Sequence, residues 1–186
     1  QITVASATGK GVQVVKSSSI SDLKVLADTK LNIASVKTLS GSVEVAANKT
    51  LTLSGTGTLG SALKLEGTLE AGANLTVSGT ISVADNATVS IPAAGTTLSY
   101  SGGNLTVGAY TFSIGGSGTF GNAADSPIVL AVEDSVLDLT GNGIISGPFR
   151  LEGGTLKASG SPTISGDITQ YDNATIEVAS GQTLTY

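Results

Sequence analysis

The chain has 186 residues, of which 40% are apolar and only 12% are charged, and its formal net charge is −5. Charged residues make up about 25% of an average globular protein, so this chain is unusually poor in charge. It contains no Cys, His, Met or Trp. This excludes a disulfide framework, a thiolate metal site and the most common catalytic base and nucleophile. Because few side chains can be oxidised, we expect an extracellular or cell-surface setting.

Charge is unevenly distributed along the chain. Residues 1–64 contain seven Lys and three acidic residues, whereas residues 65–186 contain Arg150 and Lys157 against eleven acidic residues. The first segment therefore carries +4 and the second −9. In a rod whose sequence order follows its axis, this pattern gives one positive and one negative end, which favours head-to-tail encounter. Chance asymmetry in a charge-poor chain is the alternative.

Residues 1–50 are the less regular part of the sequence and are expected to form a capping or assembly region. Within them, the alternation of Leu23 and Val25 in the segment 19–26 favours a β-strand. A short capping helix with Ser19 as its N-cap is the alternative, because Asp22 follows three residues later.

From Leu51 onward, short strands alternate with turns rich in Gly, Asn and Ser. The apolar positions Leu53, Leu65, Val77 and Val89 are 12 residues apart. A fixed period of short strands is typical of a solenoid, in which each repeat buries its apolar face against its neighbours. A single 12-residue unit is too small for a coil, so we expect two units per coil, about 24 residues.

These observations predict an all-β, single-domain parallel β-helix over residues 1–186, with regular coils over residues 51–186. We expect roughly eight coils, a rod about 40 Å long, and right-handed winding if the general crossover rule applies. Residues 115–125 are expected to be a loop that leaves the coil. The final residues, 183–186, are expected to form a strand without a polar cap. Either something else covers its open edge, or the chain was cut from a longer one.

Motifs that would carry chemistry are weak in this sequence. The segments Gly55–Gly60 and Gly116–Gly121 match a dinucleotide-binding pattern but lack the helix that receives the pyrophosphate. Glu133 and Asp134 are expected on opposite faces of one strand, and Asp134 and Asp138 on one face, where a weak Ca²⁺ site is conceivable. A solvated acidic surface is the simpler interpretation. We therefore predict a protein that is not an enzyme and has no cofactor, metal or nucleic-acid partner.

Five Asn-x-Thr sequons begin at turns that lead into strands. Each Asn is suited to hydrogen bonding within its own turn or to an amide ladder between coils. N-glycosylation is the functional alternative. The five candidate sites are Asn48, Asn74, Asn86, Asn104 and Asn173.

Threonine and aromatic residues raise the question of surface binding. Threonine arrays on a flat solenoid face can bind ice or a polysaccharide surface, although Thr is also a good residue for the solvent-facing side of any strand. Tyr100 and Phe112 occupy the same repeating apolar position as Leu53. We therefore expect them to stack inside the core rather than form a platform for sugars. No apolar stretch approaches the roughly 20 residues that a membrane helix needs, so no membrane insertion is expected.

The segment Leu51–Tyr186, with its Gly-Thr-Leu and Asn-Leu-Thr-Val units, resembles the parallel β-helix of microbial cell-surface proteins, such as adhesins and autotransporter passengers. The resemblance implies surface exposure, an elongated shape and self-association or adhesion.

The first functional hypothesis is an extracellular filament or surface-layer subunit that joins copies of itself head to tail. Its candidate end residues are Ile2 and Val4 at one end and Leu184 and Tyr186 at the other. A heterologous contact of this kind that does not close on itself gives a fibre. The alternatives are an adhesin or carbohydrate-binding module that recognises surface glycans, and a fragment of a polysaccharide-active enzyme or tailspike.

Overall fold

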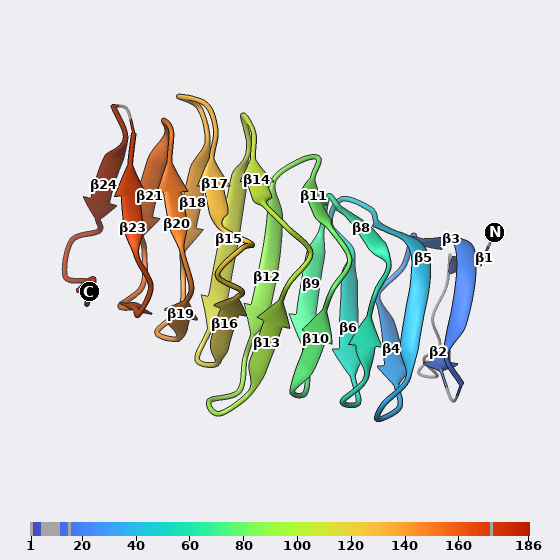
Figure 1. The fold of residues 1–186 in the computed structure, drawn as a ribbon. Coiled ribbons are helices and arrows are strands. Elements are labelled where there is room, and N and C mark those ends of the chain that lie inside the picture. Colours follow the sequence, from blue (N-terminus) through green and yellow to red (C-terminus); the bar gives the residue numbers. More distant parts are fainter. Residues whose placement is uncertain (1, 5–11, 15, 172) are drawn as a thin grey trace.

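The structure is a computed structural model that describes residues 2–4, 12–14, 16–171 and 173–186. It is a single all-β domain, a parallel β-solenoid of about eight coils, and the described residues contain 24 strands and no helix (Figure 1). Neighbouring strands in all three sheets run parallel, and their order along the rod follows the order of the sequence. The predicted fold class is therefore confirmed.

The strands belong to three hydrogen-bonded sheets. An 11-stranded sheet contains β1 (Ile2–Val4), β3 (Ser18–Val25), β5 (Thr38–Val45), β7 (Thr58–Leu59), β10 (Leu75–Val77), β13 (Thr97–Tyr100), β16 (Thr119–Asn122), β19 (Ile144–Ser146) and β22 (Thr163–Ile164), with β8 (Ala62–Leu65) and β11 (Ile81–Val83) branching from β5. A 9-stranded sheet contains β2 (Val12–Val14), β4 (Thr29–Ile33), β6 (Thr50–Ser54), β9 (Thr68–Ala71), β12 (Ala87–Ile91), β15 (Thr111–Gly116), β18 (Val136–Leu139), β21 (Thr155–Ala158) and β24 (Thr175–Val178). A 4-stranded sheet contains β14 (Leu105–Val107), β17 (Ile128–Leu130), β20 (Phe149–Leu151) and β23 (Ile168–Gln170).

The coil has three faces. The first face is the row β7, β10, β13, β16, β19 and β22, and the second face is the 9-stranded sheet. The strands β3 and β5 are long and pass a corner, so that the first half of β5 pairs with β7 and its second half with β8. The third face therefore starts with β1 and the second halves of β3 and β5. It continues through β8 and β11, and then through β14, which contacts β11 and begins the 4-stranded sheet.

The length of a coil varies from 18 to 25 residues. Leu53 pairs with Ala71, eighteen residues later, whereas Val89 pairs with Ile114, twenty-five residues later. The predicted repeat of about 24 residues lies within this range. The variation arises at the corners, because strands stay in register across coils while the turns between them differ in length.

The 12-residue period has a different origin from the one expected. Leu53 and Val89 lie on the second face, Leu65 on the third and Val77 on the first. In an eighteen-residue coil with three faces, a step of 12 residues advances by two faces. The interpretation of two 12-residue units per coil is therefore wrong in this part of the rod.

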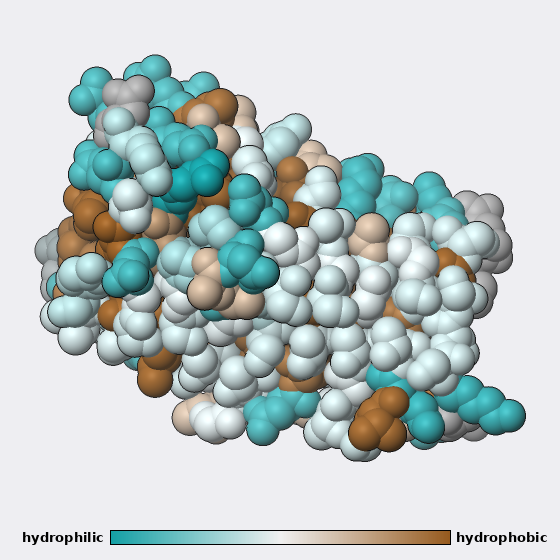
Figure 2. Space-filling view, viewed as in Figure 1, coloured by the Kyte–Doolittle hydropathy of each residue, from teal (hydrophilic) through white to brown (hydrophobic). Residues whose placement is uncertain are grey.

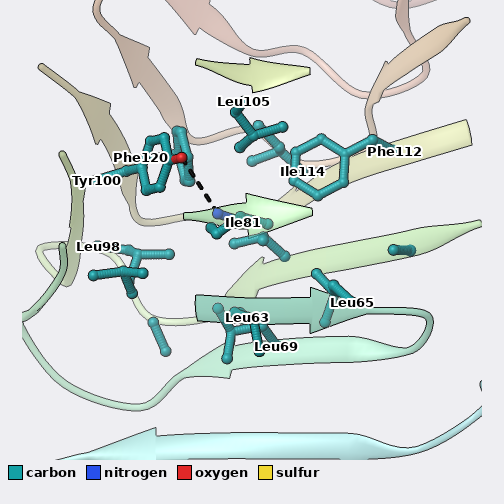
Figure 3. Packing of buried hydrophobic residues seen from close by; sticks show 14 of the residues in the cluster. Leu63, Leu65, Leu69, Ile81, Leu98, Tyr100, Leu105, Phe112, Ile114 and Phe120 are labelled. Carbon is teal, nitrogen blue, oxygen red and sulfur yellow. Dashed lines mark hydrogen bonds between the residues drawn. The ribbon is translucent and has the colours of Figure 1, made fainter. Parts of the chain in front are cut away.

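The core is a set of apolar columns enclosed by the three faces. Alternate residues of each strand point inward, as in β12, where Ala87, Val89 and Ile91 are buried. Tyr100 and Phe120 stack with ring centroids 6.3 Å apart (Figure 3). Tyr100 and Phe112 are both fully buried, so their predicted place inside the core is confirmed.

Three local expectations have clear outcomes. Residues Ser18–Val25 form β3, which confirms the strand and excludes the helix. Residues 115–125 are not a loop that leaves the coil, because β15 extends to Gly116 and β16 occupies Thr119–Asn122. Near the C-terminus, Thr185 bridges Thr163 of β22 in parallel, so the predicted strand is reduced to one bridge.

Replacement of Tyr100 by Phe is expected to remove part of the alkaline loss of stability. Burial raises the pKa of the Tyr100 phenol above its ordinary value of 10.0, against a smaller lowering by the Ile81 N–H that donates to its oxygen. The folded state therefore keeps the phenolic proton at a pH at which the unfolded state has lost it. Stability then falls as the pH rises above about 10.

The measurement is the free energy of unfolding in urea between about pH 9 and pH 11, for the native chain, Tyr100→Phe and Tyr171→Phe. Tyr171 is 67% exposed and is the matched control. We expect a shallower decline for Tyr100→Phe than for the other two proteins. Parallel curves for all three would contradict the assignment of this decline to Tyr100.

Candidate interaction surfaces

The described residues contain no group of three or more His, Cys, Asp or Glu that could hold a metal ion. Glu133 and Asp134 lie in the turn between β17 and β18, so the prediction that they share a strand is wrong. Asp138 lies on β18 with Lys157 as its register partner on β21. The acidic residues are thus divided between a turn and a strand, because the strand β17 ends at Leu130.

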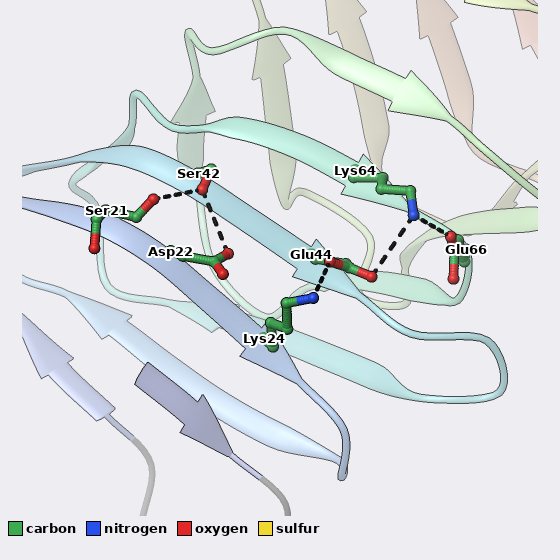
Figure 4. Close-up of polar contacts among 7 residues, drawn as sticks. All are labelled: Ser21, Asp22, Lys24, Ser42, Glu44, Lys64 and Glu66. Carbon is green, nitrogen blue, oxygen red and sulfur yellow. Dashed lines mark hydrogen bonds and ion pairs between the residues drawn. The ribbon is translucent and has the colours of Figure 1, made fainter. Parts of the chain in front are cut away.

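A charged ladder crosses the outer surface of the third face at the lysine-rich end of the rod (Figure 4). Lys24 on β3, Glu44 on β5 and Lys64 on β8 are register partners in successive coils. Glu44 lies 3.2 Å from Lys24 and 3.6 Å from Lys64, and Lys64 also pairs with Glu66.

This ladder holds neighbouring coils in register and carries no net charge. The hydrogen bond that Lys64 donates to Glu66 raises the pKa of Lys64, and the charge of Glu44 adds to this effect against a lowering by burial. Partly exposed ion pairs contribute little stability each. The ladder therefore follows the register of three successive coils and adds little to their stability.

A hollow of about 350 Å³ lies beside the ladder. Its lining includes Asp22, Ser42, Lys64, Thr80 and Ser82. Hydroxyl, carboxylate and ammonium groups can all hydrogen-bond to a sugar, but none of the lining residues is aromatic. The hollow offers polar contacts without a stacking surface.

The sequon asparagines are all exposed, and two of them connect successive coils. Asn74 Oδ1 accepts a hydrogen bond from the Thr97 N–H (2.7 Å), and Asn86 Oδ1 accepts one from the Thr111 N–H (2.8 Å). The bonds reach the next coil rather than the residue's own turn. Asn48 instead has a left-handed backbone, with φ of 59°.

Residues outside the sequons accept the same kind of hydrogen bond from a backbone N–H of the next coil. Asp28 accepts from the Thr50 N–H, and Asn142 accepts from the Ser161 N–H, both at 2.9 Å. Ser17 and Ser161 accept equivalent bonds from the N–H groups of Thr38 and Thr183, so the coil-to-coil bond needs a short side chain with an acceptor oxygen and not a sequon. Glycosylation of Asn48, Asn74, Asn86, Asn104 and Asn173 stays a prediction.

The outer surface of the first face is polar but uncharged. None of its strands, from β7 to β22, contains a charged residue, and their outward positions are mainly Thr, Ser and Gly. In Figure 2 the middle of the rod is mostly pale, as expected for residues of intermediate hydropathy, whereas teal and brown side chains gather toward the acidic end. Ile144, which is 44% exposed, interrupts the row of Thr, Ser and Gly.

The acidic end of the rod presents apolar side chains that a further coil would cover. Ile176 and Val178 on β24 are 50% and 44% exposed, although their register partners, Leu156 and Ala158, are buried. Ile176 and Val178 are the last members of columns whose other residues point into the core. They are exposed because no further coil of the described residues covers this end of the rod.

The four predicted end residues lie in different surroundings. Leu184 is partly buried and packs against the core, whereas Tyr186 is 75% exposed. Ile2 and Val4 belong to β1 and pair with Leu23 and Val25 of β3. Their side chains lie outside the described part of the structure.

No protein-family model, curated protein or solved structure matches the chain. The described residues include no helix that is long and apolar enough to span a membrane.

Proposed function

We propose that this chain is a non-enzymatic structural subunit of an extracellular filament or surface layer, in which copies join head to tail through the ends of the solenoid. The observation that carries the proposal is the exposure of Ile176 and Val178 in columns that are buried in the preceding coil. A strand layer from a second copy would cover them and satisfy the unpaired edge of β24.

The charge distribution supports the same arrangement. Sequence order follows the rod axis, so the +4 and −9 segments occupy successive parts of the rod. Head-to-tail contact brings unlike charges together, whereas head-to-head contact brings like charges together. A repeated heterologous contact that does not close on itself produces a filament.

Composition supports an extracellular setting. The chain has no Cys, Met or Trp, and these are the side chains that oxidise most readily or form disulfides. A filament exposed to oxidants would persist with such a composition.

Native protein is expected to form long particles at high concentration and low salt. Static light scattering and negative-stain electron microscopy would detect them, and assembly should be slower at high salt because screening weakens the attraction between ends. Ile176→Lys with Val178→Lys is expected to abolish assembly, since it places charges in the buried joint.

Thr106→Lys is the matched control, because Thr106 is an exposed residue on the side of the rod, and it should assemble normally. A native chain that remains monomeric at high concentration and low salt would exclude the proposal.

Glycan binding is the second candidate function, and the hollow beside Lys64 favours it. Its hydroxyl and charged groups can hydrogen-bond to sugar hydroxyls, and Val43, Ala62 and Leu63 line it as well and can contact the apolar face of a sugar ring. A glycan array that gives no signal with the monomer and with the assembled form would exclude it.

A further inference from the structure

We propose that the axial joint is made by β23 of one copy and β1 of the next, paired in parallel with Thr169 opposite Thr3. Ile168 then lies opposite Ile2, and Gln170 opposite Val4. This inference rests on the proposed head-to-tail assembly and specifies which strands meet and in which register.

The third face is the face whose register can be continued across the joint. At the lysine-rich end, Ile2 pairs with Leu23, and this column continues through Val43, Leu63 and Ile81. At the other end, a column runs from Leu105 through Ile128 and Phe149 to Ile168. Both β1 and β23 pair over three residues, with Ile2 and Ile168 as the first residue of each unit, so the two strands can pair in parallel over their full length.

The second face cannot be continued in the same simple way. The column that ends at Val178 leads back through Leu69 and Leu51 to Thr29 of β4. The first strand of this face, β2, pairs through Val12 with Leu31, two residues further along β4. The strands have thus shifted sideways along the rod, so β24 of one copy and β2 of the next would be offset along the strand direction rather than in register, although the next coil would still cover Ile176 and Val178.

The edge of β23 is incompletely covered. Ile168 is only partly buried and Gln170 is exposed, although their register partners Phe149 and Leu151 are buried. A β1 strand placed on this edge would provide the next layer of the core. Among the described residues, no strand pairs with the outer edge of β23 or of β1.

Charge complementarity favours a second copy as the occupant. The coils next to β1 carry Lys16, Lys24 and Lys30 against Asp22 and Asp28, whereas the coils next to β23 carry Glu152, Asp167 and Glu177 against Arg150 and Lys157, so the balance is positive at one end and negative at the other. Placing β1 of one copy on β23 of another brings these groups onto neighbouring coils, where unlike charges favour the correct polarity.

Disulfide cross-linking tests the register, because the chain contains no cysteine of its own. Parallel strands are about 4.8 Å apart, and disulfides join Cα atoms about 4.4–6.8 Å apart. The double variant Thr3→Cys, Thr169→Cys is expected to give a ladder of covalent oligomers on a non-reducing gel, which collapses to monomer with reductant. Either single variant should give dimers at most, and the double variant Thr3→Ser, Thr169→Ser controls for folding and assembly.

Two further pairs make the result specific. Thr3→Cys with Thr106→Cys places the second thiol in the middle of the same face and should give no ladder. Gln13→Cys with Glu177→Cys tests the competing alignment of β24 over β2. A ladder from this last pair, in place of the Thr3 and Thr169 pair, would overturn the inference.

The outcomes separate this inference from the proposed function. Filaments in the electron microscope without a ladder from the Thr3 and Thr169 pair would refute the β23–β1 joint and leave head-to-tail assembly intact. The absence of both filaments and ladder in the folded Ser control and the Cys variants would refute both proposals.

Discussion

Replacement of Phe120 by alanine is expected to lower the free energy of unfolding by about 3–5 kcal/mol. Phe120 is fully buried, and its ring stacks against Tyr100 of the preceding coil. In the register of β13, β16 and β19 it lies between Leu98 and Ile145. The substitution therefore removes apolar area and leaves a cavity that touches three successive coils.

The solenoid architecture adds a second effect. Each coil is stabilised mainly by its two neighbours, so weakening the coil of Phe120 weakens the link between the two halves of the rod. We expect urea unfolding followed by circular dichroism to become less cooperative, with a lower m-value as well as a lower midpoint.

Ile144→Ala is the matched control for Phe120→Ala. Ile144 lies on the adjacent strand β19 and is 44% exposed, so its loss should change stability by no more than about 0.5 kcal/mol. Equal costs for the two substitutions would show that the aromatic stack contributes nothing beyond an ordinary surface contact.

The alternation of apolar and polar residues correctly predicted the fold. The main wrong prediction was the number of strands per coil, and therefore the face to which each strand belongs. Alternation states which residues point inward, and this is correct in β12 and in the strand around Leu53. Membership of a face depends on how far the chain turns at each corner, which short Gly and Ser turns encode poorly. The equal spacing of Leu53, Leu65 and Val77 therefore suggested two units per coil where the coil has three strands.

Side-chain contacts between coils were the least predictable part of the structure. Tyr100 was expected to stack with Phe112, but they lie on different faces, and Phe120 is the ring partner. A pairing of this kind depends on the length of the intervening coil, which varies. It cannot be derived from apolar phase alone.

One pattern of charged residues did indicate which residues pair between successive coils. Lys24, Glu44 and Lys64 are separated by 20 residues each, which is the length of these two coils, and they form the ladder of the third face. Charges of alternating sign at the repeat length are thus a signal of cross-coil pairing that the apolar period of 12 residues concealed.

Gly116→Ala is expected to lower the free energy of unfolding by about 4 kcal/mol or more. Gly116 has φ of +98° and is the register partner of Ile91 in the preceding coil. An added Cβ would overlap the carbonyl oxygen of Ile91. That oxygen already accepts hydrogen bonds from the N–H groups of Ser117 and Gly118, so the methyl group would force two coils apart and break both bonds.

Gly95→Ala is the control that measures the cost of backbone strain alone, without the steric overlap found at Gly116. Gly95 also has a positive φ, of +79°, but an added Cβ would meet no atom within 4 Å. Its substitution should cost only the strain of a left-handed residue, about 1–2 kcal/mol. Thermal and urea unfolding of the two variants would measure the difference. If both lost the same stability, the close packing of successive backbones at Gly116 would not limit the fold, and side-chain columns alone would hold the coils together.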